Sequence, residues 1–185
     1  MNNIYFLPID IDLSGLDFTQ LDNSKKSGSW QGWWDASFIS DETIQETKFD
    51  RILSQLPHTN VTRLFHKIQS KAVDSHIDVQ PGMSYEGDEY NYLKTIEPGG
   101  YRLVLKGSTD ALWVNNNKEW VQARLPSVPC CYVINATAGY HKIEHDLNRE
   151  TIYIRGYVDE TKHQELIERS LKKYRDYALR SVSMS

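Results

Sequence analysis

Short segments of strand-like composition fill the chain from residue 61 to residue 158, and they constrain its fold more than any other feature. Apolar and β-branched residues recur within these segments, and Gly, Pro and Asn lie between them. The predicted strands span residues 61–69, 72–79, 90–96, 101–106, 112–114, 120–123, 130–135, 140–144 and 151–158. Short strands at regular spacing are typical of a β-sandwich or barrel, so we expect a mainly β fold with a barrel or double-sheet core.

The flanking segments predict helices and one further strand. Residues 4–11 have strand composition, and Pro8 predicts an edge strand because proline cannot donate a ladder hydrogen bond. Ser40 is a candidate N-cap for a helix that ends near Pro57. The apolar stripe of a C-terminal helix comprises Leu166, Ile167, Leu171, Tyr174 and Ala178. We expect a single domain over residues 1–185, with an N-terminal strand and helix support (1–60), a β-barrel core (61–158) and a C-terminal helix (160–180).

The composition argues against several kinds of partner. The formal net charge is −4 and the chain has no run of basic residues, so we expect no nucleic-acid partner. It has no apolar run long enough to cross a bilayer and no secretory signal pattern, so we expect no membrane partner. Cys130 and Cys131 are adjacent, and neighbours in a strand point to opposite faces, so they are poorly placed to pair with each other. We therefore expect a cytoplasmic protein.

The triplet His76-Ile77-Asp78 lies in a predicted strand, where alternate side chains point to one face. An imidazole and a carboxylate side by side supply two of the three ligands of a facial triad for Fe(II). The third ligand must come from a facing strand, and His141, 65 residues later (141 minus 76), is the first candidate. His145 is the alternative, although it lies closer to a predicted turn. The triplet alone is a weak signal, because a solvated Asp on a half-exposed strand gives the same pattern.

Arginines on the later strands are candidate partners for an anionic co-substrate. A 2-oxoglutarate molecule that chelates iron through its 2-oxo acid end needs a cation for its far carboxylate, and a guanidinium binds a carboxylate through two parallel hydrogen bonds. Arg149 and Arg155 share the polar face of the strand 151–158. Arg102 lies in an apolar strand, so it needs an anionic partner if it faces inward: the co-substrate, the substrate or a structural carboxylate. The alternative is that Arg149 ends a hairpin and Arg155 makes an ordinary surface ion pair.

The residues around these candidates resemble the aspartyl/asparaginyl β-hydroxylase family, whose relatives include free-amino-acid hydroxylases such as proline cis-hydroxylases. The resemblance covers roughly residues 56–159. It is carried by His76-Ile77-Asp78, by the strand around Arg102, and by the stretch from Val133-Ile134-Asn135 through His141 to Arg149 and Ile152-Tyr153-Ile154. It implies a double-stranded β-helix of the jelly-roll or cupin-like kind, together with Fe(II), 2-oxoglutarate and O2. It also implies hydroxylation of an amino acid or amino-acid residue, coupled to decarboxylation of 2-oxoglutarate to succinate.

Carried over position by position, the resemblance makes His76 and His141 the histidine ligands and Asp78 a carboxylate ligand that some members lack. Arg149 would bind the far carboxylate of the co-substrate, and Arg102 falls on a family arginine that faces the active site.

The chain departs from the family pattern at two places. Val104 stands where the family often has a histidine. The final arginine also follows the second histidine too closely, because Arg149 is eight residues after His141 (149 minus 141), whereas Arg155 is ten after His145 (155 minus 145). A shifted pairing of His145 with Arg155 is therefore an alternative ligand assignment.

Two other functions fit the same residues. A non-catalytic β-barrel binding or structural module would bind no iron at these positions. A cupin-type metalloenzyme without 2-oxoglutarate would need an additional His or Glu ligand and would leave Arg149 without a role. Residues 80–92, rich in Gly and acidic side chains, predict either a lid over the site or an ordinary polar connection. The expected substrate is a small molecule or peptide, and the oligomeric state stays open.

Overall fold

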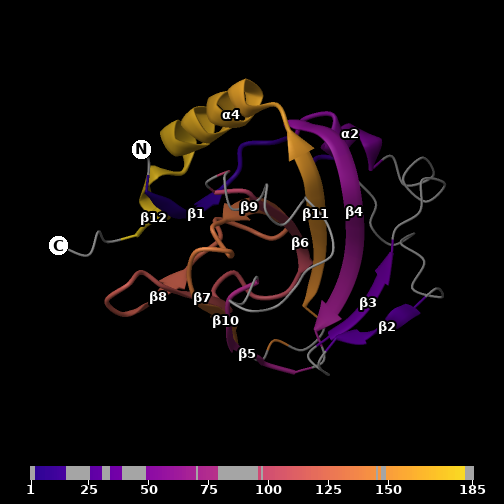
Figure 1. The fold of residues 1–185 in the computed structure, drawn as a ribbon, viewed down its shortest axis with the longest axis vertical. Helices are drawn as coiled ribbons and strands as arrows, with labels where there is room; N and C mark the ends of the chain where they lie inside the picture. Colours follow the sequence, from indigo (N-terminus) through magenta and orange to yellow (C-terminus); the bar gives the residue numbers. More distant parts are fainter. Residues whose placement is uncertain are drawn as a thin grey trace.

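Two antiparallel β-sheets form most of the computed structural model, which describes residues 3–15, 26–30, 34–38, 49–69, 71–78, 96, 98–144, 146 and 149–181 (Figure 1). The larger sheet has the order β12-β1-β9-β6-β11-β4-β3-β2. Its strands are β12 (Leu179–Arg180), β1 (Ile4–Pro8), β9 (Cys130–Ile134), β6 (Gly100–Lys106), β11 (Glu150–Val158), β4 (His58–Gln69), β3 (Trp34–Phe38) and β2 (Lys26–Trp30). The smaller sheet has the order β5-β10-β7-β8, formed by β5 (Val73–His76), β10 (His141–Ile143), β7 (Leu112–Asn115) and β8 (Trp120–Ala123). The prediction of a mainly β fold is confirmed.

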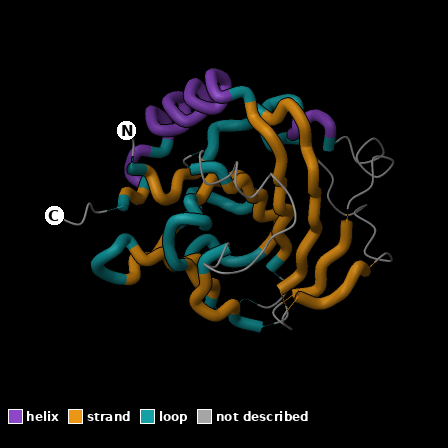
Figure 2. The backbone as a smooth tube through the Cα atoms, viewed as in Figure 1, coloured by secondary structure: helices purple, strands orange, loops and turns teal. Residues whose placement is uncertain are grey.

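The chain crosses between the two sheets repeatedly. It runs from β4 in the larger sheet to β5 in the smaller, back to β6, out again to β7 and β8, and then through β9, β10 and β11 in alternation. Strands distant in sequence therefore become neighbours, and β11 lies between β4 and β6. Figure 2 shows the strands curving around a common interior.

The larger sheet is buried on both faces because its central strands alternate between two apolar clusters. On β6 and β9, Tyr101, Leu103, Cys131 and Val133 pack with the helices. The intervening residues Val104, Cys130, Tyr132 and Ile134 pack toward the smaller sheet. This period of two follows from strand geometry, in which successive side chains point to opposite faces. The interior between the sheets is therefore lined by one alternate set of side chains.

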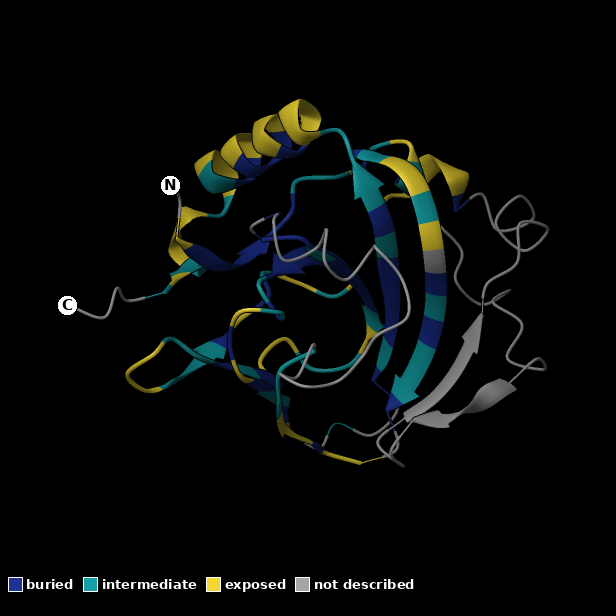
Figure 3. Ribbon diagram, viewed as in Figure 1, coloured by how far each residue is buried: buried dark blue, intermediate teal, exposed yellow. Residues whose placement is uncertain are grey.

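The described helices pack against one outer face of the larger sheet. They are α2 (Asp50–Leu53) and α4 (Glu160–Lys173); the short 3-10 helix η1 (Arg175–Tyr177) follows α4 and has no buried residue. Asp159 caps α4 by accepting a hydrogen bond from the Lys162 amide at 3.1 Å. Leu166 and Ile167 are buried against the sheet, whereas the other side of α4 is exposed (Figure 3). No described helix is long and apolar enough to cross a membrane.

Several predicted boundaries differ from the structure. The predicted edge strand is wrong, because β1 pairs with both β9 and β12. Pro8 is the last residue of β1, where a missing N–H costs the ladder least. The C-terminal helix ends at Lys173 rather than near residue 180, and the chain continues as η1 and β12. The predicted helix start at Ser40 and most of the predicted strand 90–96 lie outside the described residues.

Candidate metal centre

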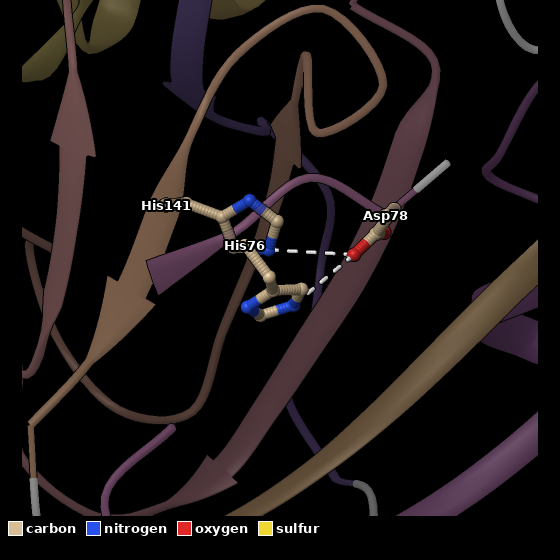
Figure 4. A group of neighbouring side chains, drawn as sticks. All are labelled: His76, Asp78 and His141. Carbon is tan, nitrogen blue, oxygen red and sulfur yellow. Dashed lines mark ion pairs between the residues drawn. The ribbon is translucent and has the colours of Figure 1, made fainter. Parts of the chain in front are cut away.

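His76, Asp78 and His141 point toward one another between the sheets (Figure 4). Their candidate ligand atoms all lie within 4.8 Å of one another. Oδ1 of Asp78 is 3.5 Å from Nε2 of His76 and 3.4 Å from Nε2 of His141. The structure thus brings together the three residues that the sequence predicted as a ligand set. Within the part of the chain that the structure describes, no other group of His, Cys, Asp and Glu is arranged to hold a metal ion.

Strand pairing places the two histidines. His141 and His76 are direct partners in the antiparallel pair of β10 and β5, so their side chains share a face and their ring centroids are 4.3 Å apart. Asp78 is different, because β5 ends at His76 and Asp78 lies in a bend beyond it. The Asp78 amide donates to the carbonyl of Ala136 at 2.9 Å. The prediction that Asp78 belongs to the same strand is therefore wrong, and a non-local hydrogen bond places it instead.

A backbone hydrogen bond selects the tautomer of His76. Its Nδ1 lies 2.8 Å from the carbonyl oxygen of Asp74, which can only accept, so Nδ1 carries the proton. The lone pair is then on Nε2, the atom that faces Asp78. Metal-binding histidines commonly donate their second ring nitrogen to a backbone carbonyl in this way.

His141 is a buried imidazole with an unused hydrogen-bonding capacity. Its side chain is 1% exposed, and neither ring nitrogen has a hydrogen-bond partner among the described residues. Burial lowers the pKa of His141 below its usual value, although the neighbouring carboxylate of Asp78 opposes the shift. The imidazole is therefore neutral near pH 7, which is the form that binds metals. A buried polar group without a partner costs free energy, so its retention points to a ligand.

Arg102 keeps the carboxylate of Asp78 ionised. Its guanidinium is 2% exposed and donates to Oδ2 of Asp78 at 2.5 Å, leaving Oδ1 toward the histidines. Burial alone would raise the pKa of Asp78, but Arg102 and the two imidazoles outweigh it and hold that pKa well below its usual range. The carboxylate therefore stays ionised. Of the three partners that the sequence allowed for Arg102, the structure shows a carboxylate of the candidate site.

Tyr153 lies between two cations. The guanidinium carbon of Arg102 is 4.3 Å from the ring centroid, and the ammonium of Lys67 is 3.7 Å from it. Burial and the nearby guanidiniums of Arg155 and Arg102 lower the pKa of Lys67 well below its usual range, although Asp78 opposes them. The positively charged form of Lys67 is therefore disfavoured in this part of the interior.

Tyr153 also contributes to two clefts, which we name by their arginines. The Arg155 cleft includes Asp78, Arg102, Thr137, Tyr153 and Arg155 in its lining. The Arg149 cleft is lined by Lys67, Gln69, Tyr132, Ile143, Arg149, Thr151 and Tyr153. Arg155, in β11, and Arg149, directly before β11, therefore line different clefts.

Arg149 and Arg155 differ in their surroundings. The Arg149 guanidinium is 2% exposed, donates to the Ser108 carbonyl at 2.9 Å and lies 3.7 Å from Asp146, while its Nε has no partner among the described residues. Arg155 is 17% exposed, and its nearest guanidinium nitrogen is 3.9 Å from Oδ2 of Asp78. His145, the alternative ligand, and the predicted lid at residues 80–92 lie outside the described residues.

Lys67 is a site residue that the sequence argument missed. It is the cross-strand partner of Thr151, so it shares the face of β11 that carries Tyr153. Strand alternation in residues 61–69 already indicated that Phe65, Lys67 and Gln69 share one face. Recognising it required knowledge that β4 pairs with β11, which the sequence order of the strands does not give.

Comparisons with known proteins add little to this geometry. No protein-family model and no curated protein sequence matches the chain. One solved structure that resembles it is the crystal structure of an oxidoreductase of the 2OG-Fe(II) oxygenase family from Burkholderia pseudomallei. The similarity covers 66% of this chain and 68% of that chain, with 13% sequence identity and a TM-score of 0.38. A likeness this distant carries no functional argument, so the arrangement of side chains must carry it.

Proposed function

We propose that this chain is an Fe(II)- and 2-oxoglutarate-dependent oxygenase that hydroxylates an amino acid or an amino-acid residue. The observation that supports it most directly is the convergence of His76, Asp78 and His141, with the ring nitrogens of buried His141 lacking any described partner. Two imidazoles and one carboxylate are the facial triad of non-haem Fe(II) oxygenases, and they leave coordination positions open.

The fold proposed for this function is a double-stranded β-helix of the jelly-roll kind. Eight strands in two facing sheets define that architecture. The support is the strand order: β4-β11-β6-β9 are consecutive in the larger sheet and β5-β10-β7-β8 in the smaller. The chain alternates between these two sets along most of its length. Strands β1, β2, β3 and β12 extend the larger sheet beyond this core.

The residues present fit a metal ion of this class. With metal–ligand bonds of about 2.1 Å, adjacent ligands at right angles lie about 3 Å apart. The separations of 3.4 and 3.5 Å from Oδ1 of Asp78 to the two Nε2 atoms are close to that value. The protonation states also fit, because His141 is neutral, His76 presents Nε2 and Asp78 is ionised. Two of the ligand separations are therefore close to the spacing that a metal ion needs, and all three ligand atoms lie within 4.8 Å of one another.

The Arg149 cleft is the proposed place for 2-oxoglutarate. A dicarboxylate that chelates the metal at one end needs a cation at the other, and the buried Arg149 guanidinium still has an unpartnered Nε among the described residues. Thr151 and Lys67 line the same cleft and add a hydroxyl and an amino group as hydrogen-bond donors. The far carboxylate would thus lie against Arg149, with Thr151 beside it.

The chemistry then divides between the bound groups and the protein. Fe(II) and 2-oxoglutarate supply activation of O2, so that one oxygen atom enters succinate as CO2 is released and the other replaces a substrate C–H by C–OH. The chain's own residues bind and orient: His76 and His141 as imidazole donors, Asp78 as an ionised donor, and Arg102 as the counter-charge that keeps it ionised. The sheets on either side limit access of water to these groups.

The test is anaerobic addition of Fe(II) and 2-oxoglutarate to the purified protein, followed by visible spectroscopy. We expect a weak charge-transfer band in the wild type and in His58→Gln, a histidine substitution outside the site, and no band in His76→Ala. Wild-type protein that retains no iron and shows no band would overturn the proposal and favour a non-catalytic β module. Iron retention without any effect of 2-oxoglutarate would instead favour a cupin-type metalloenzyme.

A further inference from the structure

The guanidinium of Arg149 is held by the turn that joins β6 to β7. Its Nη1 donates to the carbonyl oxygen of Ser108 at 2.9 Å, whereas its Nε has no hydrogen-bond partner among the described residues. A guanidinium can present its Nε–H and a terminal N–H side by side to the two oxygens of a carboxylate. The bond from Nη1 to Ser108 therefore fixes the direction of the group and leaves Nε for a ligand.

Asp146 holds Ser108 in turn. Oδ2 of Asp146 accepts the Ser108 amide at 2.5 Å, and the backbone carbonyl of Asp146 accepts the amide of Arg149 at 3.1 Å. The carboxylate itself is 3.7 Å from Nη1 of Arg149, which is beyond hydrogen-bond reach. Its effect on the direction of the guanidinium therefore passes through the backbone of Ser108.

The turn approaches Asp146 and Arg149 so closely that position 107 requires glycine. Gly107 has a φ of +123°, and a Cβ atom there would lie 2.6 Å from Oδ2 of Asp146 and 3.0 Å from Cγ of Arg149. The turn is also tied to the chain just beyond β8, because the carbonyl of Thr109 accepts the amide of Leu125 at 2.8 Å. It is therefore a fixed support for the arginine rather than a loose connection.

We propose that Asp146 is a positioning residue for the co-substrate: it fixes Ser108, and Ser108 directs the guanidinium of Arg149 toward the far carboxylate of 2-oxoglutarate. This inference rests on the proposed function, which assigns that carboxylate to Arg149. Asp146 is not among the described residues that line the Arg149 cleft, so we expect it to act without touching the co-substrate. Its removal should weaken the interaction with the far carboxylate and leave chelation of the metal by the 2-oxo acid end unchanged.

Two 2-oxo acids separate these interactions. 2-Oxoglutarate and 2-oxopentanoate have the same chain length and the same 2-oxo acid end, but only the first has a far carboxylate. Each is titrated anaerobically into the Fe(II)-loaded protein, and binding is followed by the charge-transfer band. We expect Asp146→Ala to raise the Kd for 2-oxoglutarate roughly 10-fold and to leave the Kd for 2-oxopentanoate within about twofold. Asp146→Asn keeps an acceptor oxygen for the Ser108 amide and should fall between wild type and Asp146→Ala.

A matched control and a double variant complete the experiment. Asp176→Ala removes an exposed carboxylate on η1 and should change neither Kd. If Asp146 acts through Arg149, then Asp146→Ala should add nothing to the Kd for 2-oxoglutarate in an Arg149→Leu background. Urea unfolding checks that each variant is folded, and Asp146→Asn carries the same comparisons if Asp146→Ala is not.

The outcomes separate this inference from the proposed function. An effect of Asp146→Ala that is equal for the two acids, absent for both, or additive with Arg149→Leu would overturn the inference and leave the proposed function intact. A wild type that shows no band with either acid would overturn the proposed function and this inference with it.

Discussion

Replacement of Arg102 by methionine would leave the carboxylate of Asp78 buried without its counter-charge. Two unit charges 2.5 Å apart attract each other by about 7 kcal/mol at an effective dielectric constant of about 20. Part of that loss is returned, because the variant no longer buries the guanidinium. Breaking a buried pair from one side costs about 3–5 kcal/mol in comparable cases, and Arg102 at 2% exposure belongs to that class. We therefore expect Arg102→Met to lower the free energy of unfolding by about 3–5 kcal/mol.

The assay is urea unfolding of metal-free protein in a chelating buffer at pH 7. Arg102→Met with Asp78→Asn is the matched double variant, and we expect it to regain most of the loss because neither charge of this pair remains. The wild-type pKa of Asp78 is depressed, so its stabilising contribution is present above its unfolded pKa and is lost as the pH falls further. In Arg102→Met, burial raises that pKa, and the difference from wild type should narrow as the pH falls toward 5. A loss below about 1 kcal/mol, or no recovery in the double variant, would refute the account of Arg102.

Two further predictions concern other parts of the fold. Burial lowers the pKa of His58 to about 4, with a smaller contribution from His163, so the unfolded state binds a proton more readily between about pH 6.5 and pH 4. Stability should fall by up to about 3 kcal/mol as the pH drops through that window, and His58→Gln should flatten the profile measured by urea unfolding. Gly139→Ala would place a Cβ atom 2.3 Å from the buried ring of Tyr5, in the loop that leads to His141. We expect it to cost about 1–3 kcal/mol and to weaken iron binding measured by metal titration; unchanged values for both would contradict the contact.

The residues differ in how far the sequence could predict their positions. His76 and His141 follow from strand alternation and from the need for a facing strand, and β5 and β10 do pair there. Asp78 does lie near His76, but strand alternation is not the reason. The hydrogen bond from its amide to Ala136 joins residues far apart in sequence, and no periodic pattern predicts such a bond. Lys67 required the pairing of β4 with β11, which sequence order conceals. Arg149 and Arg155 share one strand face, yet only the packing of the two sheets separates them into different clefts.

The fold predictions have the same limits. Turn residues and β-branched composition located β6, β7, β8 and β9 within a residue or two. Pro8 led to the wrong prediction that β1 is an edge strand. A proline excludes a central position only where its missing N–H would donate within the ladder, and Pro8 is the last residue of its strand. The division of the strands between two sheets depends on tertiary pairing, and no local pattern in residues 61–158 carries that information.

The crossing of the chain between two sheets also has a consequence for the order of folding. His76 and His141 are partners across β5 and β10, and β11 pairs with β4, which lies far from it in sequence. The ligand set therefore cannot form before β5 and β10 have both been synthesised and paired, and the entropy of closing such long loops slows this step. Partly made or truncated chains would lack the pocket altogether. Binding of the proposed metal ion would then require a folded core, so an incompletely folded chain would hold no ion at these residues.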